Sequence, residues 1–178
     1  MKHARLHKGA VLAALPGPHQ VGSEKGTIKA DVYIGTNFAD RYDGGQGADY
    51  ISGGNGSDVL EGGSGKDTLI GGNGDDILRG GTGEDTFVFM SAAEASANGG
   101  LIDRITDFQS GFDKIDLSAF MAGGTYVGVG PLVAGGGKQV AYDAAQAQLI
   151  GDVNGDGVAD FQIYLNTAPA VAGTDFVF

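Results

Sequence analysis

The chain has 178 residues and no cysteine, and its 22 acidic residues against 11 basic ones give a formal net charge of −11. This length predicts one compact domain or one domain with an extension, and the missing cysteine excludes disulfides, thiolate metal sites and thiol nucleophiles. So acidic a chain is a poor partner for nucleic acid, and no apolar run approaches the roughly 20 residues of a membrane span.

The first 25 residues differ in composition from the rest. They contain all three histidines and are basic, whereas the remainder is strongly acidic. We expect a flexible leader, tag or linker over residues 1–25. His3 and His7 are four residues apart, as in a helical zinc pair, but Ala4 stands where the HExxH motif has Glu. A solvated tail is therefore the preferred interpretation of the two histidines.

Two imperfect units of nine residues follow. GTIKADVYI covers residues 26–34 and GTNFADRYD covers residues 35–43, with Asp31 and Asp40 at position six and tyrosine at position eight. Both units lack glycine at positions two and four. Such degeneracy is expected of terminal repeats that cap a stack and face solvent at one end.

Five regular units then run from Gly44 to Val88, reading GGQGADYIS, GGNGSDVLE, GGSGKDTLI, GGNGDDILR and GGTGEDTFV. A fixed short period indicates one structural unit stacked on copies of itself. Positions one, two and four are always glycine, namely Gly44, Gly45, Gly47, Gly53, Gly54, Gly56, Gly62, Gly63, Gly65, Gly71, Gly72, Gly74, Gly80, Gly81 and Gly83. Position six is always aspartate, namely Asp49, Asp58, Asp67, Asp76 and Asp85.

Each regular unit predicts a tight turn followed by a short strand over its last three residues. Glycine enters positive-φ regions, so the GGxGxD part forms a turn with exposed carbonyl groups. Side chains alternate along a strand, so the residues at position eight should all point inward. These residues are Tyr33, Tyr42, Ile51, Leu60, Leu69, Leu78 and Phe87.

Stacking places the aspartates in two columns, because two turns complete one coil and alternate repeats lie above each other. One column contains Asp49, Asp67 and Asp85, with Asp31 as a weaker member; the other contains Asp58 and Asp76, with Asp40 as the weaker member. Ligands that offer only oxygen suit a hard cation with six to eight ligands, which favours calcium over zinc. If each ion bridges two turns, the roll holds about three to five calcium ions.

Calcium binding and folding should be one process in such a chain. Each unit buries a single large side chain, which cannot offset about 1 to 2 kcal/mol of backbone entropy per ordered residue. Crowded carboxylates add repulsion, so the free energy of ion binding must drive folding. Without metal, the repeats would behave as a flexible acidic linker.

The nonapeptides resemble those of the repeats-in-toxin family. The following DRITDFQSGFDKIDLSAF (residues 103–120) is similar to the segment after the roll in serralysin-type metalloproteases. The resemblance implies an all-β fold, with a right-handed parallel β-roll over residues 26–88 that continues into an antiparallel β-sandwich over residues 89–178. It also implies a secreted, extracellular bacterial protein exported by type I secretion machinery.

The C-terminal half reads as strands joined by turns. LIDRITDF and FDKIDLSAF alternate in polarity, and TYVGVGPLV, QVAYDAA, AQLIGDV and ADFQIYL are also strand-like. Between the last two, Asp152, Asn154, Asp156 and Asp160 occupy positions one, three, five and nine of a calcium loop, with Gly157 at six. Position twelve is Ile163 where an EF-hand has Glu, so we expect a hairpin calcium loop closed by Asp160; the alternative is an ordinary acidic turn.

The chain ends in TDFVF (residues 174–178). An acid followed by apolar residues at the C-terminus resembles the terminal secretion signal of the same family. A last strand that completes the sandwich is an equally good interpretation, and the two are compatible.

Known catalytic motifs are missing from the sequence, which contains no HExxH, GxSxG or GxxxxGK[ST]. The function that we expect is a non-catalytic module that folds on binding calcium outside the cell and serves a fused or separate catalytic domain. Two alternatives stay open. The module is an adhesin or carbohydrate-binding accessory of a polysaccharide-modifying enzyme, or it is a fragment of a secreted metalloprotease without its catalytic domain.

Overall fold

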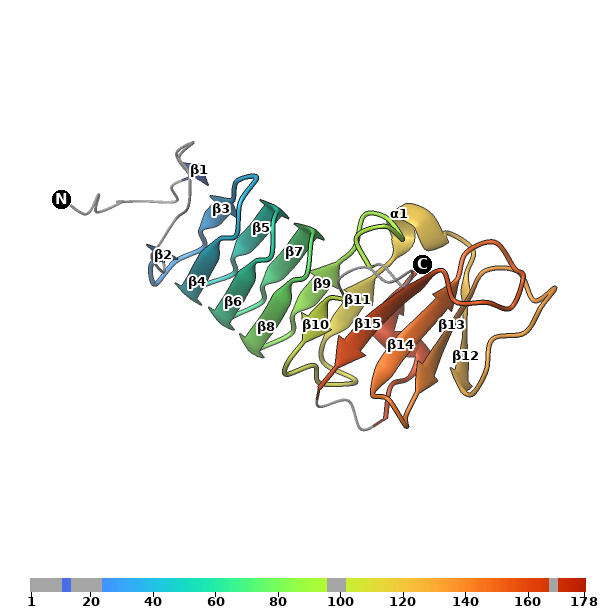
Figure 1. The fold of residues 1–178 in the computed structure, drawn as a ribbon. Coiled ribbons are helices and arrows are strands. Elements are labelled where there is room, and N and C mark those ends of the chain that lie inside the picture. The colour runs from blue at the N-terminus through green and yellow to red at the C-terminus, as the bar shows by residue number, and fades with distance from the viewer. Residues whose placement is uncertain (1–10, 14–23, 96–101, 167–169) are drawn as a thin grey trace.

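The strands of the described residues form two β-sheets that lie face to face (Figure 1). The computed structural model describes residues 11–13, 24–95, 102–166 and 170–178. Helical structure in these residues is limited to α1 (Ser118–Met121) and the 3₁₀ helix η1 (Gly173–Asp175). The expected all-β class with a parallel β-roll is therefore confirmed.

The first sheet has seven strands, and every pair in it is parallel. In spatial order its strands are β1 (Val11–Ala13), β3 (Val32–Ile34), β5 (Tyr50–Asn55), β7 (Thr68–Asn73), β9 (Thr86–Val88), β11 (Lys114–Asp116) and β16 (Phe176–Val177). The chain's last strand thus extends the sheet that the repeats begin.

The second sheet has nine strands, in the order β12 (Thr125–Val129), β13 (Gln139–Asp143), β14 (Gln148–Asp152), β15 (Phe161–Leu165), β10 (Arg104–Ile105), β8 (Ile77–Thr82), β6 (Val59–Ser64), β4 (Arg41–Gln46) and β2 (Glu24–Lys25). Only the pairs β13–β14 and β14–β15 are antiparallel in the described part of this sheet. The antiparallel character expected of the C-terminal half is confined to these three strands.

Alternate repeats stack directly, as the nine-residue period predicts. Leu69 lies opposite Ile51 on one side and Phe87 on the other, in a parallel register of 18 residues. All seven residues at position eight are at most 2% exposed and form one row between the sheets. At the N-terminal end of this row, the rings of Tyr33 and Tyr42 stack with centroids 4.0 Å apart.

Strands in the interior repeats are longer than the sequence predicts. β5, for example, has six residues, because pairing continues from YIS into the first three residues of the next unit. Pairing also ends earlier than expected elsewhere: SAF forms α1 instead of a strand, and β12 stops at Val129. Glycine main chains without Cβ atoms can approach closely enough to extend the ladder, a contribution that side-chain alternation does not reveal.

The expected leader, residues 1–25, falls largely outside the described residues, and His3 and His7 with it. Two of its segments are described, and both are strands: β1 pairs with β3, and β2 pairs with β4. No helix among the described residues is long and apolar enough to cross a membrane.

The C-terminal strand is held in place by a buried carboxylate. Asp175 is fully buried and accepts hydrogen bonds from Ser110 Oγ (2.7 Å) and from the main-chain N–H groups of Gly111 (2.9 Å) and Ala172 (2.8 Å). The next residue, Phe176, stacks its ring on Tyr126 with centroids 5.0 Å apart. The end of the chain is therefore part of the folded core.

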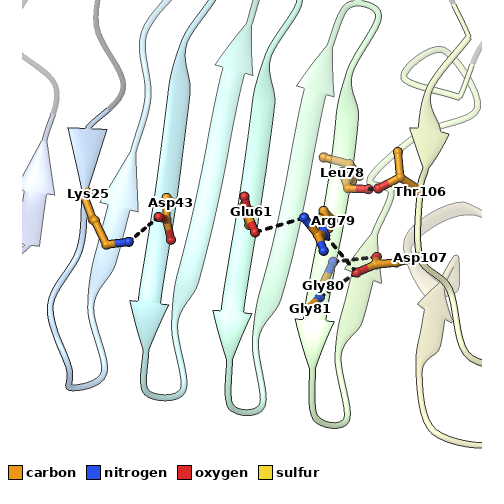
Figure 2. Close-up of polar contacts among 9 residues, drawn as sticks. All are labelled: Lys25, Asp43, Glu61, Leu78, Arg79, Gly80, Gly81, Thr106 and Asp107. Atoms are coloured by element: carbon orange, nitrogen blue, oxygen red, sulfur yellow. Dashed lines mark hydrogen bonds and ion pairs between the residues drawn. The ribbon is translucent and has the colours of Figure 1, made fainter.

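The outer face of the second sheet carries a row of charges, in which Asp43, Glu61 and Arg79 occupy position nine of alternate repeats and Lys25 and Asp107 flank the repeats (Figure 2). Lys25 pairs with Asp43 at 2.6 Å, and Arg79 lies between Glu61 at 3.4 Å and Asp107 at 3.5 Å. Exposed pairs of this kind contribute about 0 to 1 kcal/mol each. They cannot replace the turns as the main support of the stack.

Candidate calcium-binding turns

The turns of the five regular units share one backbone conformation. Their second and fourth glycines all have φ between 95° and 145°, a region that other residues rarely enter. At position one, a side chain would collide with oxygen atoms: a Cβ on Gly62 would lie 2.5 Å from Asp67 Oδ2 and 2.6 Å from the carbonyl oxygen of Gly80. Gly44, Gly53 and Gly62 therefore lie beside both a carboxylate oxygen and a carbonyl oxygen of the next turn in the column, and Gly71 and Gly80 lie beside a carboxylate oxygen.

One carboxylate oxygen of each aspartate, Oδ1, links neighbouring turns. Asp49 Oδ1 accepts a hydrogen bond of 2.7 Å from Asp31 N, and Asp67 Oδ1 accepts one of 2.8 Å from Asp49 N. The other column is built in the same way, with Asp58 Oδ1 bonded to Asp40 N at 2.7 Å. The two columns predicted from the repeat period are thereby present in the structure.

The other oxygen, Oδ2, has no partner in any regular unit. Asp49, Asp58, Asp67, Asp76 and Asp85 all bury this atom without a hydrogen bond, and all five side chains are at most 2% exposed. A buried, unpaired carboxylate oxygen costs several kcal/mol unless a cation or donor balances it. A carbonyl oxygen of the next turn borders the same Cβ position as the Oδ2 atom of Asp49, Asp58 and Asp67, so a hard divalent cation that prefers oxygen ligands fits these turns.

Main-chain groups would supply most ligands of such an ion. Among the described residues, no three His, Cys, Asp or Glu side chains gather in a way that could hold a metal. One unpaired carboxylate oxygen per turn agrees with that finding, and it suits calcium, which accepts main-chain carbonyl ligands.

Burial makes the metal-free carboxylates weak acids. It raises the pKa of Asp49, Asp76 and Asp85 to about 6 and that of Asp58 to about 7, with a smaller opposing effect from the N–H group that each accepts. Neighbouring carboxylates raise the pKa of Asp58 further. In the absence of a cation, the turns thus disfavour the ionised form of their own aspartates. A bound cation would reverse this effect.

The columns extend beyond the repeats through two residues that the sequence analysis did not single out. Asp103 Oδ1 accepts a hydrogen bond of 2.8 Å from Asp76 N, and Asp113 Oδ1 accepts one of 3.1 Å from Asp85 N. Burial raises the pKa of Asp103 to about 8. The signal was present in the sequence, since Asp103-Arg104-Ile105 and Asp113-Lys114-Ile115 repeat the Asp-x-apolar pattern of positions six to eight.

The hairpin loop between β14 and β15 differs from the roll. Asp152 is fully buried, but its Oδ1 accepts from Gly155 N (2.6 Å) and its Oδ2 from Gly157 N (2.7 Å). Asp160 Oδ2 accepts from Val153 N at 2.7 Å. The loop therefore brings its acids together through its own N–H groups, and the calcium site at residues 152–160 stays a prediction.

Comparison with known proteins gives one family match and several structural neighbours. The family model described as "Peptidase M10 serralysin C terminal" matches residues 23–178. No curated protein sequence matches the chain. The solution structure of the AlgE6R2 subunit of the mannuronan C5-epimerase from Azotobacter vinelandii is 26% identical, covers 97% of this chain and 94% of its own, and has a TM-score of 0.53. The AlgE6R3 subunit of the same enzyme is 30% identical over 93% of this chain and 86% of its own, with a TM-score of 0.42.

Proposed function

Because the chain belongs to the family of serralysin C-terminal domains of peptidase M10, we propose that it folds on binding calcium outside the cell and supports the type I secretion and stability of an extracellular protein. The chain is a calcium-binding β-roll module and not itself a catalytic domain. The observation that carries the proposal is the set of five buried aspartates whose Oδ2 atoms have no partner.

Each ion would bind between consecutive turns of a column. In the turn at residues 62–67, Asp67 Oδ2 and the carbonyl oxygen of Gly80 both border the position of a Cβ on Gly62, so both can face one ion. The same arrangement surrounds Gly44, with Asp49 Oδ2 and the Gly62 carbonyl each 2.5 Å from that position. A bound cation would satisfy the carboxylate and hold two turns together.

Calcium outside the cell would decide whether the roll folds. A site with a Kd of about 10⁻⁴ M gains about 1.4 kcal/mol at about 1 mM calcium and almost nothing at submicromolar calcium. Five such sites give about 7 kcal/mol, comparable with the whole stability of a small domain. The chain would leave the cytoplasm unfolded and fold where calcium is abundant.

The C-terminal residues are the proposed secretion signal. In the folded protein they lie in η1 and β16, with Asp175 fully buried and Phe176 8% exposed. A transporter would therefore reach these residues only in the unfolded chain. This accessibility supports the proposal that calcium-driven folding follows export.

Two experiments test the proposal. Isothermal titration calorimetry should show calcium binding with a large heat of folding, and magnesium at the same concentration should not replace it. In a host with a type I transporter, the chain should be exported, and deletion of residues 174–178 should retain it in the cell. Absence of calcium-coupled folding, or export that does not depend on the last five residues, contradicts the corresponding half of the proposal.

A binding module for an acidic polysaccharide is the second candidate. It is supported by the similarity to a mannuronan C5-epimerase module and by Arg104, whose guanidinium lies 5.0 Å from the ring centroid of Tyr164 on the second sheet. Arginine on an aromatic ring is a common element of ligand-binding surfaces. A glycan array decides this point: binding to a uronic-acid polymer that Arg104→Ala abolishes would support it, and no binding at all would remove it.

A further inference from the structure

The first two units have a different turn from the five regular ones. Thr27 and Lys29 occupy positions two and four of the first unit, and Thr36 and Phe38 those of the second. None of these four residues has a positive φ; among the described residues other than glycine, only Ala147 does. The main chain of these two turns therefore differs in φ from that of the regular turns at positions two and four.

In the first two units, threonine supplies the hydrogen-bond donors that the aspartate Oδ2 lacks in the regular turns. Asp31 Oδ2 accepts hydrogen bonds from Thr27 N (2.6 Å) and Thr27 Oγ1 (2.9 Å). Asp40 Oδ2 accepts the same pair from Thr36, at 2.7 Å and 2.9 Å. This is the carboxylate oxygen that is buried without a partner in all five regular units. Two donors on one oxygen balance it without a cation.

The first glycine of each cap unit keeps the neighbours that it has in the regular turns: a Cβ on Gly26 would meet the Gly44 carbonyl oxygen and Asp31 Oδ2, and a Cβ on Gly35 would meet the Gly53 carbonyl oxygen and Asp40 Oδ2. In the first unit a phenol group is added, since Tyr42 Oη lies 2.8 Å from the Cβ position of Gly26. Asp40 keeps one buried oxygen without a partner, Oδ1. In regular units Oδ1 accepts the N–H group of the preceding turn in its column, and for Asp40 that turn lies outside the described residues.

We propose that the turns at residues 26–31 and 35–40 hold no calcium, and that Thr27 and Thr36 replace the ion there. The roll then binds five ions, one for each aspartate with an unpaired Oδ2, and begins with a cap that needs no metal. Asp31 and Asp40 are structural acceptors in this assignment, although they match the position-six pattern of the ligands. The assignment rests on the proposed function, because it requires the regular turns to bind calcium.

Counting bound ions by native mass spectrometry in calcium tests the assignment. Asp31→Asn should keep the number of ions of the wild-type protein, whereas Asp67→Asn should lose one. Asp85→Asn repeats the loss at a second position, in case Asp67→Asn does not fold. The double variant Thr27→Gly/Lys29→Gly converts the first turn to GGIGAD and should gain one ion, which a further Asp31→Asn change should remove.

The outcomes separate the two proposals. Loss of an ion in Asp31→Asn, or a wild-type count in the double glycine variant, overturns the threonine cap while leaving calcium binding intact. A wild-type protein without bound calcium, or Asp67→Asn and Asp85→Asn that both keep every ion, overturns the proposed function itself.

Discussion

Replacing Asp58 by asparagine separates the two roles of a position-six carboxylate. The side chain is fully buried; its Oδ1 accepts a hydrogen bond from Asp40 N at 2.7 Å, while its Oδ2 has no partner. Asparagine keeps the shape and the Oδ1 acceptor. It places an N–H donor beside the carbonyl oxygen of Gly71, because that oxygen and Asp58 Oδ2 both border the Cβ position of Gly53. Only the negative charge, and with it the ion, is lost.

The sign of the effect should depend on calcium. At about 1 mM calcium, loss of one site with a Kd of about 10⁻⁴ M lowers the free energy of unfolding by about 1.4 kcal/mol. For a domain of this size that is a decrease of about 3–6 °C in Tm. In excess chelator Asp58→Asn should be at least as stable as the wild type, because burial of the charge, which raises the pKa of Asp58 to about 7, no longer opposes folding.

Circular dichroism measures both effects: denaturant unfolding gives the loss of stability in calcium, and the folded fraction without denaturant compares the two proteins in chelator. Asp43→Asn is the matched control, since Asp43 lies on the outer face and pairs with Lys25 (Figure 2). Its change should be about 0.2–1 kcal/mol in calcium, with the same folded fraction as the wild type in chelator. The reasoning is refuted if Asp58→Asn loses no stability in calcium, or if it is less folded than the wild type in chelator.

Three further predictions concern pH, the core and the turns. In excess chelator the folded fraction of the roll should rise as pH falls from 8 to 5, because aspartates with raised pKa values, such as Asp103 at about 8, bind more protons folded than unfolded. Circular dichroism without denaturant measures this fraction, and the same spectrum at both pH values would contradict the prediction. Leu69→Ala should lower the free energy of unfolding by about 2–5 kcal/mol in calcium, because Leu69 is fully buried. Thermal unfolding measures the loss, with the outward-facing Ile70→Ala as the control. Equal losses in the two variants would argue against a row of inward-pointing residues at position eight. Gly65→Ala should lower the calcium affinity measured by calorimetry far more than Gly111→Ala. Both glycines have positive φ, but only Gly65 faces a carbonyl oxygen, that of Gly47. Similar affinities in the two variants would show that calcium binding does not require close packing of the turns.

Much of the roll could be predicted because its sequence repeats in phase. A fixed period of nine sets which residues point inward, and an offset of two units sets the parallel register that places Leu69 opposite Ile51. No other short-range information is needed to predict the interior repeats, since each of them contacts the same kind of neighbour on both sides.

The ends of the roll could not be predicted in the same way. Asp31 and Asp67 occupy the same position in their units, but their Oδ2 atoms have different surroundings, which depend on a threonine four residues earlier in one case and a glycine in the other. Asp103 and Asp113 continue the columns after insertions that break the nine-residue spacing. Likewise, two of the three donors to Asp175 come from Ser110 and Gly111, more than sixty residues away along the chain.

The central claim is that the roll folds because calcium binds its turns. Hydrogen exchange of the main-chain amides in β5 to β8, measured with excess chelator and again with about 1 mM calcium, tests it most directly. We predict exchange at the rate of an unfolded chain in chelator and strong protection in calcium, with both changes reversible. Strong protection of these four strands in chelator would contradict the claim.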